Sequence, residues 1–568
     1  FSQERLWFLD QLDPNSPAYN IHSATRFHGP LNIKAIEQTL TELTRRHESL
    51  RTTFAVVDGK PIQVIAEPAP FRLQLTDLSG LEQSEREREA ERLATAEAEC
   101  PFDLSKGPLL RIHLIRLGEN DHLWVENIHH IISDDWSMKI FTQELAELYH
   151  AFAHDQPSPY TDLPLQYVDF AQWQRDWLQG EVLDAQVAYW KKQLDGTLPV
   201  LQLPTDRPRP ANQNYRGTHE TFLVPGSLYN ALKTVGDKEG VTLFMLVLAA
   251  FNTLLYRYSG QDDIIVGSPI AGRSQVETEK MIGFFLNTLV LRTDLSGNPT
   301  FRELLRRVRE VCLGAYAHQE IPFEPLLEQL RVKRDLSRTP LFQTMLVLQN
   351  VPVGRPRMKG LSVTEIPGRS QTAKFDLLLS LMETKEGLRV ALQYDSEIFE
   401  RSRIQRMGEH FVRLLEEVAR DPNRRISEIG MLRESERQQL LVDWNRNSLE
   451  YAKEKCVHEL FAEQALRRAE ATAVTYDAER LSYAELNARA DQLANYLQRL
   501  GIKREDRVGV YLERSVNMIV SFLAVLKAGA AYVPLDLTYP RERISLMLDD
   551  AQIEFLLTGQ QHLEAGTA

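Results

Sequence analysis

The amino-acid sequence predicts an α/β fold divided among several domains. Segments with the two-residue spacing of strands and the 3.6-residue spacing of helices follow one another along most of the chain. The 568 residues are several times the roughly 150 residues of a typical domain. With 43% hydrophobic and 26% charged residues, the composition is that of a globular protein, which excludes disordered and low-complexity classes.

Residues 1–178 predict a first α/β lobe. Its expected strands are Asn20–His28, a run within Pro61–Leu75, and His122–Ser133. Its expected helices are Ile33–His47, Glu82–Glu99 and Trp136–Phe152. The Glu82–Glu99 segment is rich in Glu and Arg, which is typical of a solvated helix and not of a binding patch.

Residues 179–432 predict a second α/β lobe and include a run of prolines between positions 199 and 210. Its expected strands are Thr218–Val224, Asp263–Gly267, Thr344–Leu348, Phe375–Met382 and Arg389–Tyr394. Its expected helices are one that ends near Tyr256, one that contains Cys312, and Ser402–Ala419. Cys312 lies on the apolar stripe of its helix, so we expect an inert core residue.

A polar segment, residues 433–456, predicts a linker with a short helix, and a new domain is expected over residues 457–568. The expected helices of this domain are Val457–Glu470, Ser482–Leu500 and Val516–Ala528, and its expected strands are Arg507–Leu512 and Ala531–Leu535. This βαβ order spans about 110 residues, fewer than a complete doubly wound domain needs. We therefore expect a truncated module.

Charge and cysteine content narrow the classes of partner and the compartment. The net charge of −13 disfavours nucleic acid as a partner. The three cysteines, Cys100, Cys312 and Cys456, are too far apart for a zinc or CxxC motif, which favours a reducing compartment, the cytoplasm, and predicts no metal site. The apolar run from Val241 to Tyr256 is shorter than roughly 18 residues and the N-terminus shows no signal peptide, so no contact with a membrane is predicted.

Two adjacent histidines end the expected strand His122–Ser133. Because side chains alternate across a sheet, the rings of His129 and His130 are expected to point to opposite faces, and only one of them can serve a site. On spacing alone, such a histidine is more often a hydrogen-bonded core residue than a catalytic one. A metal site with Asp134 and Asp135 is weaker, since adjacent strand positions diverge.

Two neighbours of the histidines have simpler interpretations. Asp134 is predicted to be the N-cap of the following helix. Ser133 lacks the G-x-S-x-G turn that exposes a nucleophilic hydroxyl, so a nucleophilic role is not predicted for it.

The segment His129–Ser137 reads His-His-Ile-Ile-Ser-Asp-Asp-Trp-Ser and resembles the HHxxxDG motif of nonribosomal peptide synthetase condensation domains. Six further segments resemble motifs of that family in the same order: Ser2–Leu9, Arg46–Phe54, Tyr167–Trp173, Ile282–Thr288, His318–Glu324 and Arg334–Leu341. Leu481–Leu486 and Leu526–Asp536 resemble the start of an adenylation domain. The sequence contains no phosphate loop of that family, so amino-acid activation is not predicted.

The resemblance implies two lobes like those of chloramphenicol acetyltransferase, arranged in a V around a central tunnel, followed by a partial α/β adenylation subdomain. It implies that the chain joins a donor aminoacyl or peptidyl thioester to the amine of an acceptor aminoacyl thioester. Donor and acceptor peptidyl carrier proteins would deliver both on 4'-phosphopantetheine arms, and the chain itself would bind no cofactor. An adjoining adenylation domain would be a further partner.

The same resemblance implies roles for single residues. His130 is the functional second histidine, as a base or as a residue that positions the amine, and His129 is structural. Asp134 is implied to form a buried ion pair with Arg51. Ser133, Trp136 and Asn287 are expected near the tunnel, although Asn287 can equally be a hydrogen-bonded structural amide. Arg334, Asp335 and Arg338 are expected to form a structural polar network.

Asp135 stands where the family has glycine, a residue suited to left-handed backbone or to close approach. Aspartate tolerates left-handed φ, so the fold is expected to survive, but the side chain could narrow the passage beside His130. The rival hypothesis is therefore a catalytically impaired module that only docks carrier proteins. The motif favours an L-configured donor, and the adenylation start disfavours epimerisation.

Overall fold

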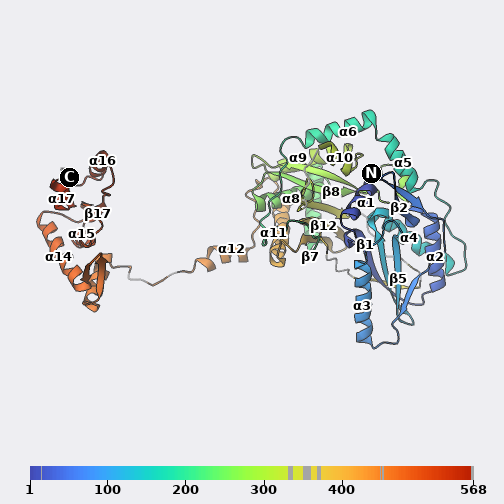
Figure 1. Cartoon of the computed structure of the whole chain (residues 1–568), viewed down its shortest axis with the longest axis horizontal. Coiled ribbons are helices and arrows are strands. Elements are labelled where there is room, and N and C mark those ends of the chain that lie inside the picture. Colours follow the sequence, from blue (N-terminus) through green and yellow to red (C-terminus); the bar gives the residue numbers. More distant parts are fainter. Residues whose placement is uncertain are drawn as a thin grey trace. The chain divides into compact units, whose positions relative to one another are not determined.

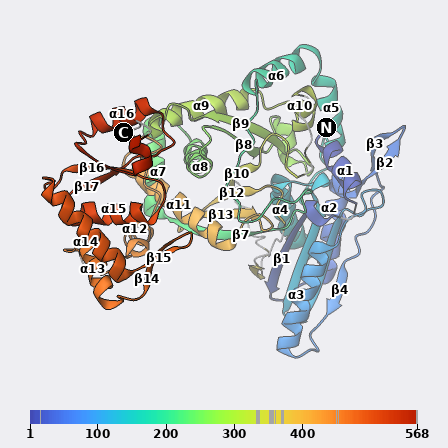
Figure 2. The same cartoon turned by 60° about the vertical axis from the view of Figure 1, so that its left-hand side comes forward.

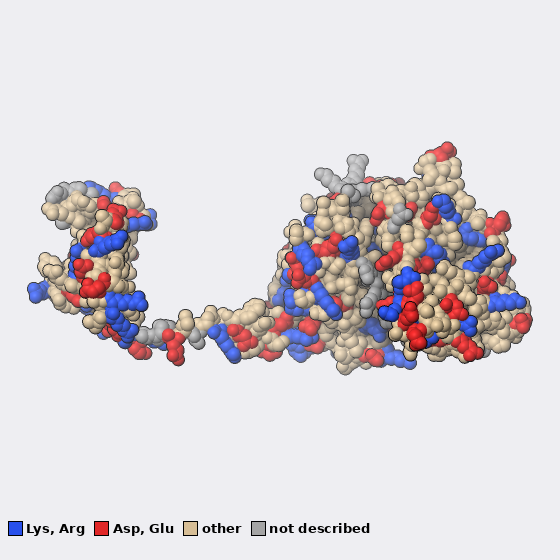
Figure 3. All heavy atoms as spheres, turned by 60° about the horizontal axis from the view of Figure 1, so that its bottom comes forward, with Lys and Arg blue, Asp and Glu red and all other residues tan. Residues whose placement is uncertain are grey.

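The computed structural model describes residues 1–14, 16–330, 335, 337–349, 358, 360–366, 372–447, 449–450 and 453–564. The chain divides into two compact units, Phe1–Leu441 and Val442–Ala568 (Figure 1). Figure 3 shows acidic and basic side chains interspersed over the face of each unit that it presents. The predicted boundaries at 178, 432 and 456 remain predictions.

The first lobe is built on a five-stranded sheet with the order β11-β1-β6-β5-β4; strands β1 and β4 of this sheet are labelled in Figure 2. The strands are β1 (Asn20–His28), β4 (Gln74–Asp77), β5 (Leu110–Gly118), β6 (Asp121–His129) and β11 (Ser362–Ile366). The helices are α2 (Ile33–Arg46), α3 (Gln83–Glu99) and α4 (Asp135–Phe152). Since side chains alternate along β6, Trp124 and Ile128 pack in the core that contains α2 and α4, whereas Leu123 and Val125 pack in the core that contains α3.

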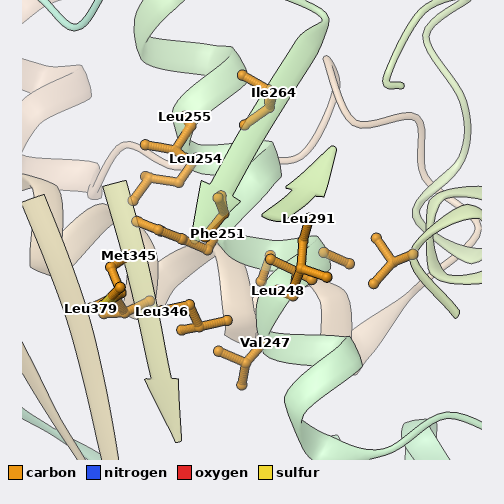
Figure 4. Close-up of a cluster of buried hydrophobic side chains, with 14 of the residues drawn as sticks. Val247, Leu248, Phe251, Leu254, Leu255, Ile264, Leu291, Met345, Leu346 and Leu379 are labelled. Carbon is orange, nitrogen blue, oxygen red and sulfur yellow. The ribbon is translucent and has the colours of Figure 1, made fainter. Parts of the chain in front are cut away.

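The second lobe is built on a six-stranded sheet with the order β7-β13-β12-β10-β8-β9. The strands are β7 (Gly217–Pro225), β8 (Asp263–Ile270), β9 (Asn287–Asp294), β10 (Thr344–Gln349), β12 (Leu377–Thr384) and β13 (Gly387–Asp395). The helices of its core are α7 (Gly226–Glu239), α8 (Leu243–Ser259), α9 (Phe301–Ala317) and α11 (Arg401–Arg420). Figure 4 shows Val247, Leu248 and Phe251 of α8 facing leucines of the sheet, so α8 is the central helix of this core.

Strand β11 links the two lobes. It follows β10 in the second lobe but pairs antiparallel with β1 of the first, with Ala24 opposite Ile366 and His28 opposite Ser362. The sequence division at residue 178 does not account for this return. A strand from the second lobe therefore completes the sheet of the first lobe and joins the two lobes.

The second unit has a three-stranded parallel sheet in which β16 (Arg507–Tyr511) lies between β17 (Ala531–Pro534) and β18 (Phe555–Thr558). A hairpin of β14 (Thr472–Tyr476) and β15 (Glu479–Ser482) precedes it. Its helices include α13 (Val457–Arg467), α14 (Tyr483–Arg499), α15 (Val516–Lys527) and α16 (Arg541–Asp550). The predicted βαβ order is confirmed, and helix α12 (Glu434–Leu441) lies within the predicted linker.

Most predicted elements are confirmed with small shifts at their ends. The exception is His122–Ser133, because the strand ends at His129 and His130–Ile132 form a 3₁₀ turn. Within the described residues, no single helix has both the length and the hydropathy needed to span a membrane. Helices α7 and α8 meet those two criteria only when they are taken together, and they are bent by 103° relative to one another.

Helix α8 ends on a glycine that an L-residue replaces poorly. Gly260 has φ 72° and donates its N–H to the Tyr256 carbonyl at 2.8 Å. We expect Gly260→Ala to lower the free energy of unfolding by about 1 kcal/mol, because Cβ disfavours left-handed backbone. Gly430→Ala is the matched control, because an added Cβ has no neighbour within 4 Å at either glycine but only Gly260 has a left-handed φ. Equal denaturation midpoints for the two variants would contradict this account.

Candidate functional site

A cavity of about 1080 Å³ lies in the first unit and is lined by residues of both lobes. The first lobe contributes Tyr19 and His130, and the second contributes Phe284, Thr288, Phe342 and Lys374. Helix α1 (Ser2–Leu12) adds Arg5 and Leu6. The walls are therefore mainly apolar with a few charged groups, as in sites that bind small organic groups.

His130 lies at the start of the 3₁₀ turn and lines this cavity. Its Nδ1 is 2.8 Å from the Ser133 carbonyl oxygen. A carbonyl can only accept, so Nδ1 carries the proton and a neutral ring keeps its lone pair on Nε2. The ring packs edge-on against Phe284 at 5.2 Å between centroids. Burial, and then the charge of Lys374, lower the His130 pKa to about 4, so the ring is neutral at cellular pH.

His129 lies in the core of the first lobe. Its side chain is buried, and its Nδ1 accepts a hydrogen bond from the Ile131 N–H at 3.1 Å. The ring stands edge-on to Phe102, and burial lowers its pKa to about 3. The two rings differ in environment because the chain leaves the strand between them, and not because of strand alternation.

Asp134 is the N-cap of α4, as predicted. Its Oδ1 accepts from the Ser137 N–H at 2.8 Å, and its Oδ2 accepts from the Phe285 N–H at 2.9 Å. The predicted ion pair between Asp134 and Arg51 is wrong. Asp134 pairs instead with Arg273 at 3.3 Å, and the two side chains are only 3% and 2% exposed.

Arg51 belongs to another part of the first lobe. It donates to Glu48 at 3.2 Å and to the Ala66 carbonyl. Arg273 follows β8 in the second lobe, and its guanidinium also donates to the Ser137 hydroxyl at 2.8 Å and the Met281 carbonyl at 2.8 Å. The pair Asp134–Arg273 thus joins the two lobes behind His130.

Two of the residues expected near the tunnel, Ser133 and Trp136, have side chains that are hydrogen-bonded to other groups. The Ser133 hydroxyl is fully buried and donates to the Met138 sulfur at 3.2 Å. Trp136 donates from Nε1 to the Glu279 carbonyl at 3.0 Å. Neither residue is among those that line the cavity.

Asn287, at the start of β9, is a hydrogen-bonded structural amide, which was one of the two roles expected for it. Its Nδ2 donates to the Gln319 and Ile321 carbonyls at 2.9 and 2.8 Å, and its Oδ1 accepts from the N–H groups of Thr288 and Phe323. All its polar groups are therefore satisfied by backbone. Thr288 and Phe284, which sequence reasoning did not single out, line the cavity in its place.

Asp135 is the first helical residue of α4 and is not among the described residues with positive φ. The position therefore does not require the backbone freedom of glycine, and a carboxylate in the first turn is favourable to the helix dipole. Burial, followed by the neighbouring Asp134, raises the Asp135 pKa.

Of the expected polar network, Asp335 and Arg338 lie 3.8 Å apart and line the cavity. Arg334 lies outside the described residues. No group of three or more His, Cys, Asp or Glu side chains arranged to hold a metal occurs among the residues that the structure describes.

Comparison with known proteins assigns both parts of the chain. Residues 1–441 match the condensation domain, and residues 461–568 match the AMP-binding enzymes. A linear gramicidin synthase of Brevibacillus parabrevis is 50% identical over 563 residues, which cover 99% of this chain and 11% of that protein. Chondramide synthase cmdD of Chondromyces crocatus is 44% identical over 99% of this chain and 14% of its own length. The chain thus spans about a tenth of the length of these relatives.

Solved structures agree with the fold. A holo four-domain nonribosomal peptide synthetase bound to AMP and glycine superposes with a TM-score of 0.82 at 25% identity, covering 99% of this chain and 43% of that one. The X-domain from teicoplanin biosynthesis gives a TM-score of 0.69 at 31% identity, covering 76% and 96%. The expected two-lobed α/β architecture is therefore confirmed. The chain belongs to the condensation-domain family of nonribosomal peptide synthetases, and a short N-terminal piece of an AMP-binding enzyme follows that domain.

Proposed function

We propose that this chain forms an amide bond between a donor aminoacyl or peptidyl thioester and the amine of an acceptor aminoacyl thioester, with His130 beside the reacting nitrogen. The observation that carries the proposal is a neutral imidazole that lines a cavity shared by two lobes. The hydrogen bond from Nδ1 to the Ser133 carbonyl leaves Nε2 as the acceptor on that ring.

The reaction needs no oxidant or further reagent. The acceptor nitrogen attacks the thioester carbonyl carbon, a C–N bond forms, and His130 Nε2 accepts a hydrogen bond or the proton from that nitrogen. The C–S bond then breaks, and the thiolate leaves with a proton as the free thiol. A pKa of about 4 makes His130 a weak base, so orienting the neutral amine is its main contribution.

The substrates would arrive on 4'-phosphopantetheine arms of donor and acceptor carrier proteins, and an adenylation domain would supply the acceptor residue. A cavity of about 1080 Å³ with mainly apolar walls suits two such chains meeting end to end. The arms belong to the substrates, so the chain itself would hold no cofactor. The motif supports an L-configured donor, and three free cysteines support the cytoplasm as the compartment.

Carrier proteins loaded with a donor and an acceptor test the proposal directly. Incubation with the chain is expected to give a peptide on the acceptor carrier, detected by mass spectrometry of the intact protein. A donor carrier with a blocked acceptor amine is the control and should give no product. Binding of both carriers without product would contradict the proposal and would favour the docking module.

The rival hypothesis, an impaired module that only docks carrier proteins, depends on Asp135. We expect Asp135→Gly to change turnover less than about threefold, because the position is helical and needs no glycine. The same variant should lose about 1 kcal/mol of unfolding free energy, since glycine is a poor helix residue. Product formed only after Asp135→Gly would contradict this expectation and show that the site is impaired in the parent.

A further inference from the structure

Lys374 is one of several charged residues that line the cavity containing His130. It precedes β12, and its Nζ lies 4.3 Å from the centroid of the Tyr19 ring. The segment is held in place through its backbone, because the Lys374 carbonyl accepts from Gln213 Nε2 at 3.0 Å and from the Thr339 hydroxyl at 3.2 Å. The backbone at Lys374 is therefore fixed, and the ammonium group lies against the Tyr19 ring.

Among the residues that the structure describes, Asp135 is close enough to favour the charge of Lys374, but it forms no ion pair with the ammonium. Lys374 forms no ion pair within 4.0 Å in that part of the chain, and the other cation near it, Arg5, is paired with Glu324 at 3.3 Å. A half-buried charge without a contacting counter-ion is costly, and the Tyr19 ring compensates it only in part. Such a group is suited to an anion that the chain does not itself provide.

The proposed reaction generates an anion of that kind. When the amine nitrogen attacks the thioester carbonyl carbon, the C=O electron pair moves to oxygen and gives a tetrahedral intermediate with a negative charge. We propose that the Lys374 ammonium donates a hydrogen bond to this oxyanion and stabilises it until the C–S bond breaks. This inference rests on the proposed function and adds to it a second catalytic residue, on the opposite lobe from His130.

The electrostatics of the cavity are consistent with that role. Lys374 is the largest contribution to the lowered pKa of His130 after burial, so the two groups are close enough to interact. The charged and titratable groups that act on Lys374 are Arg5, which disfavours its charge, and Asp135, which favours it. Burial and Arg5 lower the Lys374 pKa to about 8, so the ammonium is present at neutral pH and is lost above that value.

Charge removal at this position is the direct test. We expect Lys374→Met to lower kcat for amide formation roughly 100-fold, as for the loss of one oxyanion donor, and Lys374→Arg to retain more activity because the charge remains. Lys385→Met, in the exposed turn after β12, is the matched control and should match the parent. Equal kcat for the parent and Lys374→Met would overturn the proposal.

The alkaline pH dependence of the rate is a readout that a merely structural role would not move, and the titration of His130 tests whether Lys374 lies close to that ring. The parent rate should fall above about pH 8 as Lys374 deprotonates, and this fall should be absent in Lys374→Met. In chain labelled with ¹³C-histidine, the His130 pKa should move upward from about 4 in Lys374→Met, with His130→Ala identifying the signal. An unmoved His130 pKa and an unchanged alkaline fall would both contradict the assignment.

These outcomes separate the two proposals. If the parent forms no peptide, the proposed function fails, whatever the titration shows. If the parent forms peptide and Lys374→Met forms it equally fast, only the role of Lys374 fails. Should Lys374→Met unfold, Lys374→Gln and Lys374→Arg carry the same comparison, because both keep a polar group beside Tyr19.

Discussion

Replacing His130 by alanine is expected to lower the rate of amide formation about 100-fold, the low end of the range for a positioned base. The reason for the low end is the His130 pKa of about 4, which makes the imidazole a weak proton acceptor but a good hydrogen-bond acceptor for a neutral amine. The measurement is single-turnover peptide formation with preloaded carriers, which separates the chemical step from carrier exchange. His219→Ala, at an exposed position of β7, is the control and should match the parent.

The acid side of the pH–rate profile tests the role of His130 a second time. Since His130 is already neutral down to about pH 4, the loss of rate below pH 8 should follow the acceptor amine, whose pKa is about 7.7 to 8.0. The limb should therefore keep its midpoint in His130→Ala while the plateau falls. A plateau that equals the parent's would remove His130 from the reaction, and a midpoint that moves in this variant would contradict the assignment of this limb to the acceptor amine.

The sequence predicted those parts of the fold that depend on short-range spacing. The helix Ile33–His47 is observed as α2, Ile33–Arg46, because its apolar residues recur every three to four positions and pack on one face. Strand β1 is predicted with the observed ends for a similar reason. Strand β11 was missed because its five residues pair with β1, far away in the chain, and carry little pattern of their own.

The residues of the site also fall into two groups: those that short-range motifs predict and those that only the fold brings together. Local motifs placed Asp134 as an N-cap and selected His130, since both assignments depend on residues within one turn. The partner of Asp134 could not be read in this way, because Arg273 and the Phe285 N–H reach it from the second lobe. Lys374 was missed for the same reason: only the fold brings it into the cavity with His130.

The largest loss of stability is expected where those distant residues meet. Asp134→Ala should lower the free energy of unfolding by about 3 to 5 kcal/mol, because it leaves the Arg273 guanidinium buried without its counter-ion. It also removes the acceptor of two backbone N–H groups, those of Ser137 and Phe285. Denaturation followed by tryptophan fluorescence reports this loss, since six of the seven tryptophans lie in the first unit.

The matched comparison is between two arginines. Arg273→Met should destabilise the first unit by several kcal/mol, whereas Arg51→Met should cost about 1 kcal/mol or less, because Arg51 pairs with Glu48 near the surface. In double variants, Asp134→Ala and Arg273→Met should be strongly non-additive, since each removes the same buried pair. Asp134→Ala and Arg51→Met should be additive to within about 0.5 kcal/mol. Coupling of Asp134 to Arg51 instead of Arg273 would restore the pairing expected from the motif and contradict the contact between the two lobes.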